Sequence, residues 1–225
     1  MAWTQAFLDT FDRANSTTVG NSWSQSISST SNVTSYGIVS NRFGLTTSPA
    51  TARNFGINRD TTVGYTRAVE ATMVVTPNAA IVYVGRRGAS LIWSPYAGYG
   101  YLASVAVSTG VVSIVRADSG TGTAIGSGSG VPVAAGTVYR LEHDQDGSLR
   151  FYANGTQYAS ATDTTYMAGS DTNAYGCGLI VQTTNVAARK DGYFDDFRIY
   201  EQPAPTGAPI HLFRTTFYSP AIVGS

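Results

Sequence analysis

The chain has 225 residues, with 14 basic and 14 acidic side chains, two histidines and a single cysteine. A formal charge of zero without a basic block argues against a nucleic-acid-binding surface, and one cysteine excludes a disulfide framework. No apolar run is long enough to span a membrane, and the opening residues, MAWTQAFLDTFDR, have neither a basic start nor a continuous apolar stretch. We therefore expect a protein made in the cytoplasm, without an export signal or a membrane segment.

Periodicity predicts strands along nearly the whole chain and no helix, because no window of eleven or more residues keeps a 3.6-residue apolar period. The predicted strands span residues 6–11, 23–27, 37–39, 42–45, 65–75, 80–86, 90–93, 99–107, 111–117, 176–182 and 192–200, with a hairpin at 139–155. Residues 120–130, GTGTAIGSGSG, are too poor in apolar groups for a strand and predict a surface loop. So many short strands predict an all-β fold, a two-sheet antiparallel jelly-roll sandwich.

The hairpin at residues 139–155, YRLEHDQDGSLRFYANG, is the best-defined local pattern in the chain. Alternation gives it one apolar face, made by Tyr139, Leu141, His143, Leu149, Phe151 and Ala153. These residues share a face only if the loop holds an odd number of residues, so the turn is expected to be bulged or longer than two residues. The register that we favour places Asp144 opposite Arg150 and Glu142 opposite Tyr152 on the polar face.

The two ends of the predicted sandwich carry alternating aromatic residues with acids between them, and they are expected to pair edge to edge. These ends are residues 7–12, FLDTFD, and 193–200, YFDDFRIY. Together with residues 9–23, DTFDRANSTTVGNSW, and the hairpin, they make the chain resemble the concanavalin A-like lectin and glucanase superfamily. More narrowly, it is similar to laminin-G-like domains of minor tail proteins in phages that infect actinobacteria.

This resemblance, which covers about residues 6–201, implies a virion protein made in the host cytoplasm. It implies a non-enzymatic tail or surface decoration protein, present in multiple copies in a symmetric assembly. Its lectin-like domain is expected to contact host cell-envelope glycans, with no nucleic acid and no membrane as partner. A free carbohydrate-binding lectin module and a laminarinase-type glycoside hydrolase are the alternatives.

The hydrolase alternative depends on three acids of the hairpin. Glucanases of the superfamily carry a Glu-x-Asp-x-x-Glu or Glu-x-Asp-x-Glu strand with a nucleophile, a supporting Asp and an acid/base. Glu142, Asp144 and Asp146 fill these positions here, but Asp146 is one methylene shorter and belongs to the turn. Because Asp144 is expected to pair with Arg150, we predict that the chain has no catalytic residues and is not an enzyme.

An aromatic segment offers a binding surface instead. Residues 93–101, WSPYAGYGY, place four large rings around a proline-glycine turn, and exposed rings can stack on sugars. The carbohydrate-binding candidates are Trp93, Tyr96, Tyr99, Arg86 and Arg87. In the competing interpretation Tyr99 and Tyr101 share one strand face and belong to the core.

Other reactive residues have structural explanations. His143 is expected to be a hydrogen-bonded residue on the inner hairpin face, and Cys177 a buried free thiol. We predict no cofactor. Calcium is the one ion that the laminin-G-like resemblance suggests, and its weak candidates, each also explained by a turn or by a strand-end acid pair, are Asp171, Asn173, Asp195 and Asp196.

The chain divides into a sandwich domain at residues 1–202, a proline-rich linker at 203–209 and a C-terminal arm at 210–225. The arm is rich in aromatic and branched residues, which is unusual for a solvated tail. We predict that this extended arm docks onto other virion proteins through Ile210, Leu212, Phe213, Phe217, Tyr218, Ile222 and Val223. The alternative is an arm that folds back onto its own sandwich.

Overall fold

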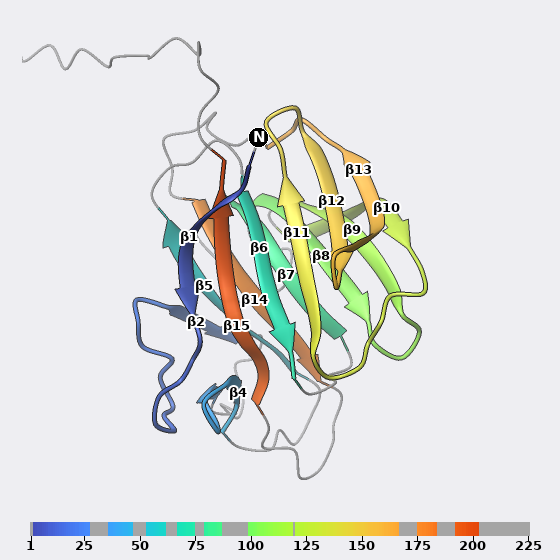
Figure 1. Cartoon of the computed structure of the whole chain (residues 1–225). Helices are drawn as coiled ribbons and strands as arrows, with labels where there is room; N and C mark the ends of the chain where they lie inside the picture. Colours follow the sequence, from blue (N-terminus) through green and yellow to red (C-terminus); the bar gives the residue numbers. More distant parts are fainter. Residues whose placement is uncertain are drawn as a thin grey trace, which may run out of the picture.

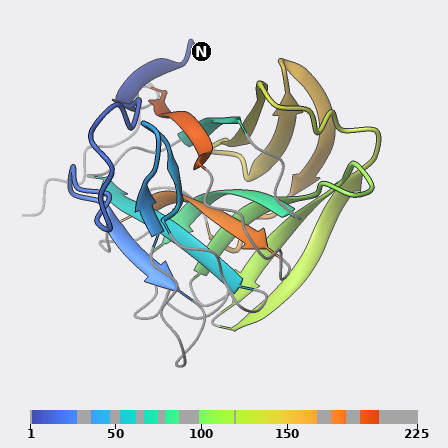
Figure 2. The ribbon, with the colours of Figure 1, turned by 90° about the horizontal axis from the view of Figure 1, so that it is seen from below.

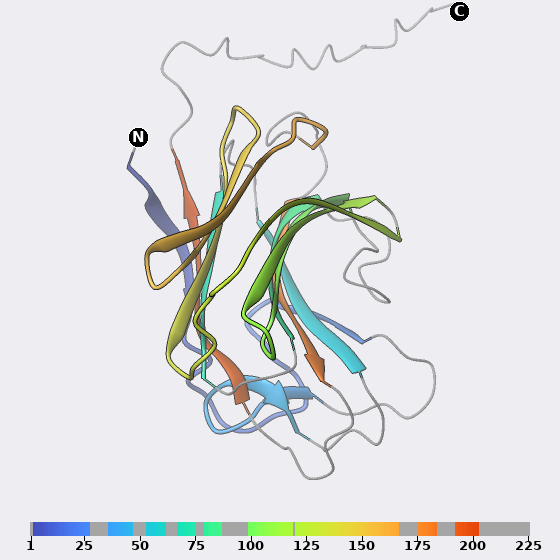
Figure 3. The ribbon, with the colours of Figure 1, turned by 90° about the vertical axis from the view of Figure 1, so that its right-hand side faces the viewer.

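The protein is a sandwich of two antiparallel β-sheets that lie face to face as two layers (Figures 1 and 3). The computed structural model describes residues 2–27, 36–46, 53–61, 67–74, 79–86, 99–118, 120–166, 175–183 and 192–202. The predicted all-β jelly-roll sandwich is confirmed. Within these ranges no helix is long and apolar enough to cross a membrane. The predicted linker and arm, residues 203–225, lie outside the described residues.

The eight-stranded sheet contains both ends of the described chain. Its strands are β1 (Thr4–Asp9), β3 (Tyr36–Ile38), β4 (Phe43–Leu45), β6 (Arg67–Met73), β11 (Thr137–His143), β12 (Ser148–Ala153), β13 (Thr156–Thr162) and β15 (Gly192–Glu201). They follow the order β13-β12-β11-β6-β15-β4-β3, and β1 also pairs with β15. The predicted pairing of the two ends is confirmed, because Phe7 lies opposite Ile199 and Asp9 opposite Phe197.

The seven-stranded sheet forms the second layer. Its strands are β2 (Ser24–Ile27), β5 (Arg53–Thr61), β7 (Ala79–Arg86), β8 (Tyr99–Ala106), β9 (Val111–Asp118), β10 (Thr121–Gly128) and β14 (Tyr175–Thr183). Their order is β10-β9-β8-β7-β14-β5-β2. The two sheets enclose one apolar core, into which alternate residues of described strands such as β11 and β12 point. The largest fully buried side chains of the described residues are Tyr101, Tyr139, Phe11, Phe43, Phe151, Phe194 and Phe197.

The hairpin of β11 and β12 has the predicted inner face, with Leu141 opposite Phe151 and both side chains buried. Its loop has an odd number of residues, as predicted, but the predicted register is wrong. Glu142, not Asp144, lies opposite Arg150. The loop consists of residues 145–147, closed by a hydrogen bond from Gly147 N to Asp144 O (3.1 Å). Gly147 takes the left-handed position (φ 81°) that a three-residue loop requires, which fixes the turn one residue earlier than predicted.

Residues 120–130 contain a strand, so the predicted surface loop is wrong. Here β10 forms the edge of its sheet and lies against β13, the edge of the other sheet (Figures 1 and 2). An added Cβ at Gly126 would lie 2.6 Å from the carbonyl oxygen of Ser160. An added Cβ at Gly128 would overlap the carbonyl oxygen of Tyr158. The glycines therefore allow two strand backbones to approach closely. The loop prediction was wrong because it took the same glycines as a sign of flexibility.

The close contact of β10 and β13 predicts that Gly128→Ala destabilises the protein by about 2 kcal/mol or more, since a methyl group there forces the backbones apart. Ser127→Ala, an exposed position on the same strand, is the matched control and should change stability by less than about 0.5 kcal/mol. Chemical denaturation of both variants checks this. Equal stability of the two variants would contradict the proposed contact.

Candidate functional site

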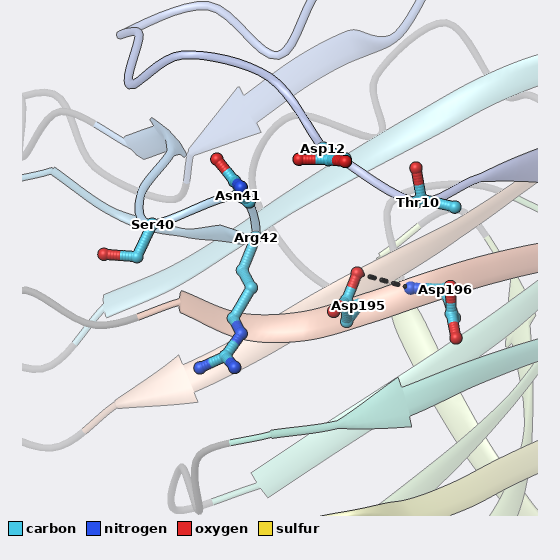
Figure 4. A pocket seen from close by; sticks show the side chains of 7 residues that line it. All are labelled: Thr10, Asp12, Ser40, Asn41, Arg42, Asp195 and Asp196. Atoms are coloured by element: carbon cyan, nitrogen blue, oxygen red, sulfur yellow. Dashed lines mark hydrogen bonds between the residues drawn. The ribbon is translucent and has the colours of Figure 1, made fainter.

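A pocket of about 380 Å³ opens beside β15, where three segments distant in sequence meet (Figure 4). It is lined by Thr10, Asp12, Ser40, Asn41, Arg42, Asp195 and Asp196. The first two residues follow β1, the next three belong to the turn between β3 and β4, and the aspartates belong to β15. The pocket is thus polar, with three carboxylates and one guanidinium group.

The turn between β3 and β4 is held in one conformation by its own hydrogen bonds. Val39 N donates to Arg42 O (2.8 Å) and Arg42 N to Val39 O (3.1 Å), with Ser40 at φ 50° and Asn41 at φ 60°. Two successive left-handed residues are the pattern of a type I′ turn, which suits the twist of a hairpin. Asn15 Oδ1 accepts from Ser40 N (2.8 Å), so the segment after β1 fixes the turn from outside.

A β-bulge sets the direction of the two aspartates of β15. The register against β6 shifts between Asp195 and Arg198, and Asp196 has φ 48°. Asp195 Oδ1 accepts from Asp196 N (2.9 Å), and Arg198 Nη2 lies 3.2 Å from Asp196 Oδ2. Burial raises the pKa of Asp195, and the neighbouring Asp196 and Asp12 add to this effect. The bulge therefore brings a desolvated carboxyl group to the pocket wall.

The segment that carries Thr10 and Asp12 is anchored by Asp9, which is 3% exposed. Arg13 donates from its two terminal nitrogens to the two carboxylate oxygens of Asp9 (2.8 and 2.9 Å), and Trp23 Nε1 donates a third bond (2.7 Å). Burial raises the pKa of Asp9, but the hydrogen bonds outweigh it and lower the pKa to about 2. The hydrogen bonds of Asp9 thus fix the segment that brings Thr10 and Asp12 to the pocket.

The predicted calcium candidates are only partly placed. Asp171 and Asn173 lie outside the described residues. Asp195 and Asp196 share the pocket, where burial raises the pKa of Asp195 although Arg42 opposes this, and Arg198 pairs with Asp196. Across the described ranges, no group of three or more His, Cys, Asp or Glu side chains is arranged to hold a metal. Arginine side chains thus supply positive charge beside both aspartates.

The hairpin acids lie on the polar face of the eight-stranded sheet, away from the core. Glu142, only 7% exposed, has its Oε1 atom 2.9 Å from Arg140 Nε and its Oε2 atom 3.3 Å from Arg150 Nε. Arg150 also pairs with Asp144, as predicted, although from a diagonal position. Both carboxylates are thus held by arginines.

Pairs of acids and arginines also connect the neighbouring strands on this face. Glu70 lies 3.5 Å from Arg140 and 3.1 Å from Arg198. Asp146 occupies the turn, as predicted, where a hydrogen bond from Ser148 N lowers its pKa. A glycosidase acid needs a raised pKa, so the position and environment of Asp146 do not suit that role.

The predicted carbohydrate-binding residues fall largely outside the described part of the chain. This applies to Trp93, Tyr96 and Arg87. Of Arg86 and Tyr99 the backbone is described, and the two residues lie opposite one another at the ends of β7 and β8. The intervening residues 87–98 therefore begin and end at one end of the seven-stranded sheet.

A buried histidine, whose role the sequence did not reveal, joins the two sheets. His143 is 2% exposed, and its ring packs edge-on against Tyr101 of the other sheet, with ring centroids 4.9 Å apart. Its inner position is as predicted, but its hydrogen bonding is not, because Nε2 has no hydrogen-bond partner among the described residues. Burial lowers the pKa of His143 to about 4, although Asp163 and Asp146 oppose the shift.

A cluster of polar side chains surrounds the hydroxyl group of Tyr101. We call it the polar end cluster, and its members are Tyr101, Arg116, Asp118, Asp163, Thr165 and Tyr166. Tyr101 donates to Asp163 Oδ1 (2.9 Å) and accepts from Tyr166 N (3.0 Å). No local motif marks this cluster, because its members are separated by up to 65 residues in sequence.

One arginine links the two acids of the polar end cluster. Arg116 Nε donates to Asp118 Oδ2 (3.0 Å) and Nη1 to Asp163 Oδ2 (2.8 Å). Tyr166 donates its hydroxyl hydrogen to Asp118, which together with Arg116 lowers the pKa of Asp118. Burial raises the pKa of Asp163, but hydrogen bonds from Thr165, Tyr101 and Arg116 lower it to about 2. Both acids are therefore ionised at neutral pH.

We compared the chain with known proteins. No protein-family model matches it, and no curated protein sequence matches it. Among solved structures, the carbohydrate recognition domain of Emp46p in its potassium-bound form is similar, with TM-score 0.61 and 10% identity, covering 90% of this chain and 100% of that one. The exoplasmic/lumenal domain of VIP36 bound to Ca²⁺ and Man2 has TM-score 0.60 and 9% identity, covering 89% and 88%.

A third similar structure is a protein of unknown function with a galectin-like fold from Bacillus subtilis. Its TM-score is 0.58 at 10% identity, covering 89% of this chain and 98% of that one. The likeness extends over almost the whole of each domain. It establishes that the chain has the fold of lectin carbohydrate recognition domains, as the concanavalin A-like resemblance predicted.

The buried neutral state of His143 predicts a pH-dependent stability. Its pKa is about 4 in the folded protein and 6.5 when unperturbed, so from pH 6.5 down to 4 only the unfolded chain gains a proton. The free energy of unfolding should therefore fall as the pH is lowered through this interval, by about 3 kcal/mol in total. Chemical denaturation between pH 7 and pH 4 measures the fall.

The His143→Phe variant keeps a ring at this position and removes the titration. Its stability should depend much less on pH between 6.5 and 4 than that of the unmodified protein. Asp9 and Asp163 contribute little to the difference between the two proteins, because most of their effect on stability falls below about pH 4 and both proteins retain these acids. Identical pH slopes for both proteins would rule out His143 as the cause.

Proposed function

We propose that this chain is a carbohydrate-binding module without enzymatic activity. The observation that carries the proposal is the two-sheet fold, which the chain shares over about nine-tenths of its length with carbohydrate recognition domains. Its formal charge of zero suits neutral partners better than nucleic acids or strongly acidic polymers.

The state of the hairpin acids supports binding rather than hydrolysis. A retaining glycosidase needs two carboxyl groups about 5 Å apart, one of them with a raised pKa. Glu142 and Asp144 are each engaged by arginines, and the pKa of Asp146 is lowered. These contacts hold Glu142 and Asp144 in the sheet surface, and Asp146 lacks the raised pKa that hydrolysis requires.

The aromatic segment supplies the binding surface that the proposal needs. Arg86 and Tyr99 stand opposite one another at the end of the seven-stranded sheet, and residues 87–98 connect them. Trp93 and Tyr96 lie between these two positions in the sequence, and loops of a rigid sandwich commonly carry binding residues. A stacked aromatic ring combined with arginine donors suits a sugar ring with several hydroxyl groups.

The purified full-length chain should bind members of a broad glycan array. Trp93→Ala or Tyr96→Ala should weaken binding about tenfold or more, because each removes a ring face from the sugar contact. Tyr152→Ala, on the polar face of the other sheet, is the control and should bind normally. Absence of binding to every glycan on the array would contradict the proposal.

The same preparation distinguishes a hydrolase. We expect no release of reducing sugar from laminarin or arabinogalactan. Release that Glu142→Gln abolishes would instead identify a glycoside hydrolase and overturn the structural interpretation of the hairpin.

We expect this module to need no metal ion, although related folds occur in calcium-bound and potassium-bound forms. Arg42 and Arg198 already supply positive charge to the acids of the pocket beside β15. Calcium should therefore leave the melting temperature unchanged after chelator treatment. A saturable rise that Asp195→Asn abolishes and Asp144→Asn does not would show that calcium binds there.

The predicted place of this module on a phage particle is a separate proposal. It is supported by the resemblance to minor tail proteins and by the composition of residues 203–225, which lie outside the described residues. Detection of the protein in purified particles would test it.

A further inference from the structure

We infer that the polar end cluster is a contact site for neutral, hydroxyl-rich glycans. The inference rests on the proposed carbohydrate binding and assigns part of it to residues that the sequence did not indicate. The central member is Asp118, whose carboxylate is held in place by Arg116 and Tyr166.

The cluster lies at the end of the seven-stranded sheet where β7 ends and β8 begins. Asp118 stands directly opposite Tyr99 in the pairing of β8 and β9, and Tyr99 stands opposite Arg86 of β7. Three adjacent strands therefore bring Arg86, Tyr99 and Asp118 into one row at the sheet end. A ligand that bound at this end of the sheet would meet the cluster.

The carboxylate of Asp118 can accept more hydrogen bonds than the protein gives it in the contacts above. Oδ2 accepts from Arg116 Nε and Oδ1 from Tyr166, and each oxygen has a second lone-pair position. The side chain is 30% exposed, so part of it is open to solvent. Two neighbouring acceptors on one fixed carboxylate match the spacing of adjacent sugar hydroxyl groups.

The geometry of the cluster is set before any ligand arrives. Arg116 is held between Asp118 and Asp163, and Asp163 also accepts hydrogen bonds from Tyr101 and from Thr165 N (2.8 Å). A charge-assisted network of this kind holds its side chains in one arrangement, which reduces the ordering cost of binding.

The charge of the cluster selects the class of glycan. It contains one arginine and two ionised aspartates, which leaves one net negative charge. Asp146 adds another acid near His143, since its charge acts on the pKa of that histidine. A carboxylated or sulfated sugar would be repelled here, whereas a neutral sugar donates hydroxyl hydrogens to the carboxylates.

The hydrogen bonding of His143 is a second, independent indication. Its ring packs on Tyr101, a member of the cluster, and its buried Nε2 atom lacks a partner among the described residues. A buried polar atom without a partner is unfavourable, and such atoms occur where water, an ion or a ligand supplies the missing bond.

Calorimetric titration of the full chain with mannotriose, laminaritriose and trigalacturonate tests the inference. We expect at least one neutral trisaccharide to bind, and Asp118→Asn to weaken its affinity about tenfold or more. Tyr166→Phe, which keeps the ring and removes one donor to Asp118, should weaken binding less. Asp144→Asn, an aspartate paired with an arginine on the other sheet, should bind normally.

The outcomes separate this inference from the proposed function. Glycan binding that survives both Asp118→Asn and Tyr166→Phe, with melting temperatures near that of the unmodified protein, overturns the inference and leaves the proposed function intact. Trigalacturonate binding as strong as that of the neutral sugars overturns the assigned ligand class. Binding to no glycan on the array overturns both proposals.

Discussion

The hydrogen bonds of the buried Asp9 carboxylate are the interaction on which the chain between β1 and β2 depends. The carboxylate accepts five hydrogen bonds, from Phe11 N, from Arg13 twice, and from the side chains of Asn21 and Trp23. These bonds hold Phe11 at φ 53°, an unfavourable conformation for a large side chain, and orient Trp23 against Phe197 of β15, with ring centroids 5.0 Å apart. One ionised group thus fixes the chain between β1 and β2 over the core.

The sequence predicted most of the architecture, because alternation and turn chemistry are local. The apolar faces of β11 and β12 and the pairing of β1 with β15 follow from a two-residue period. The register of the hairpin did not follow, since it depends on which residue takes the left-handed position, and Gly147 takes it. The prediction of a loop was wrong at residues 121–128 for a different reason. Gly126 and Gly128 allow a close contact with a strand of the other sheet, and a local sequence pattern does not reveal such a contact.

Among the candidate functional residues, only those that are close together in the sequence could be interpreted in advance. The interpretation of Glu142, Asp144 and Asp146 as structural acids follows from their spacing around one turn. The polar end cluster could not be predicted, because Tyr101, Arg116 and Asp163 belong to three separate parts of the chain and meet only after the sheets pack. The missing hydrogen bond of His143 could not be predicted either, because it depends on which residues surround the ring in the folded protein.

The contact of β10 with β13 also bears on how the molecule behaves at high concentration. Each of these strands is the last of its sheet, and a last strand normally offers unpaired backbone groups to any other chain. Here the two edges face one another at a distance that only glycine permits, so each restricts access to the other. A protein with few charged residues, 12% of the chain, has little electrostatic repulsion to keep copies apart. Its resistance to edge-to-edge aggregation along this side therefore depends on Gly126 and Gly128, the two residues without side chains that let the edges meet.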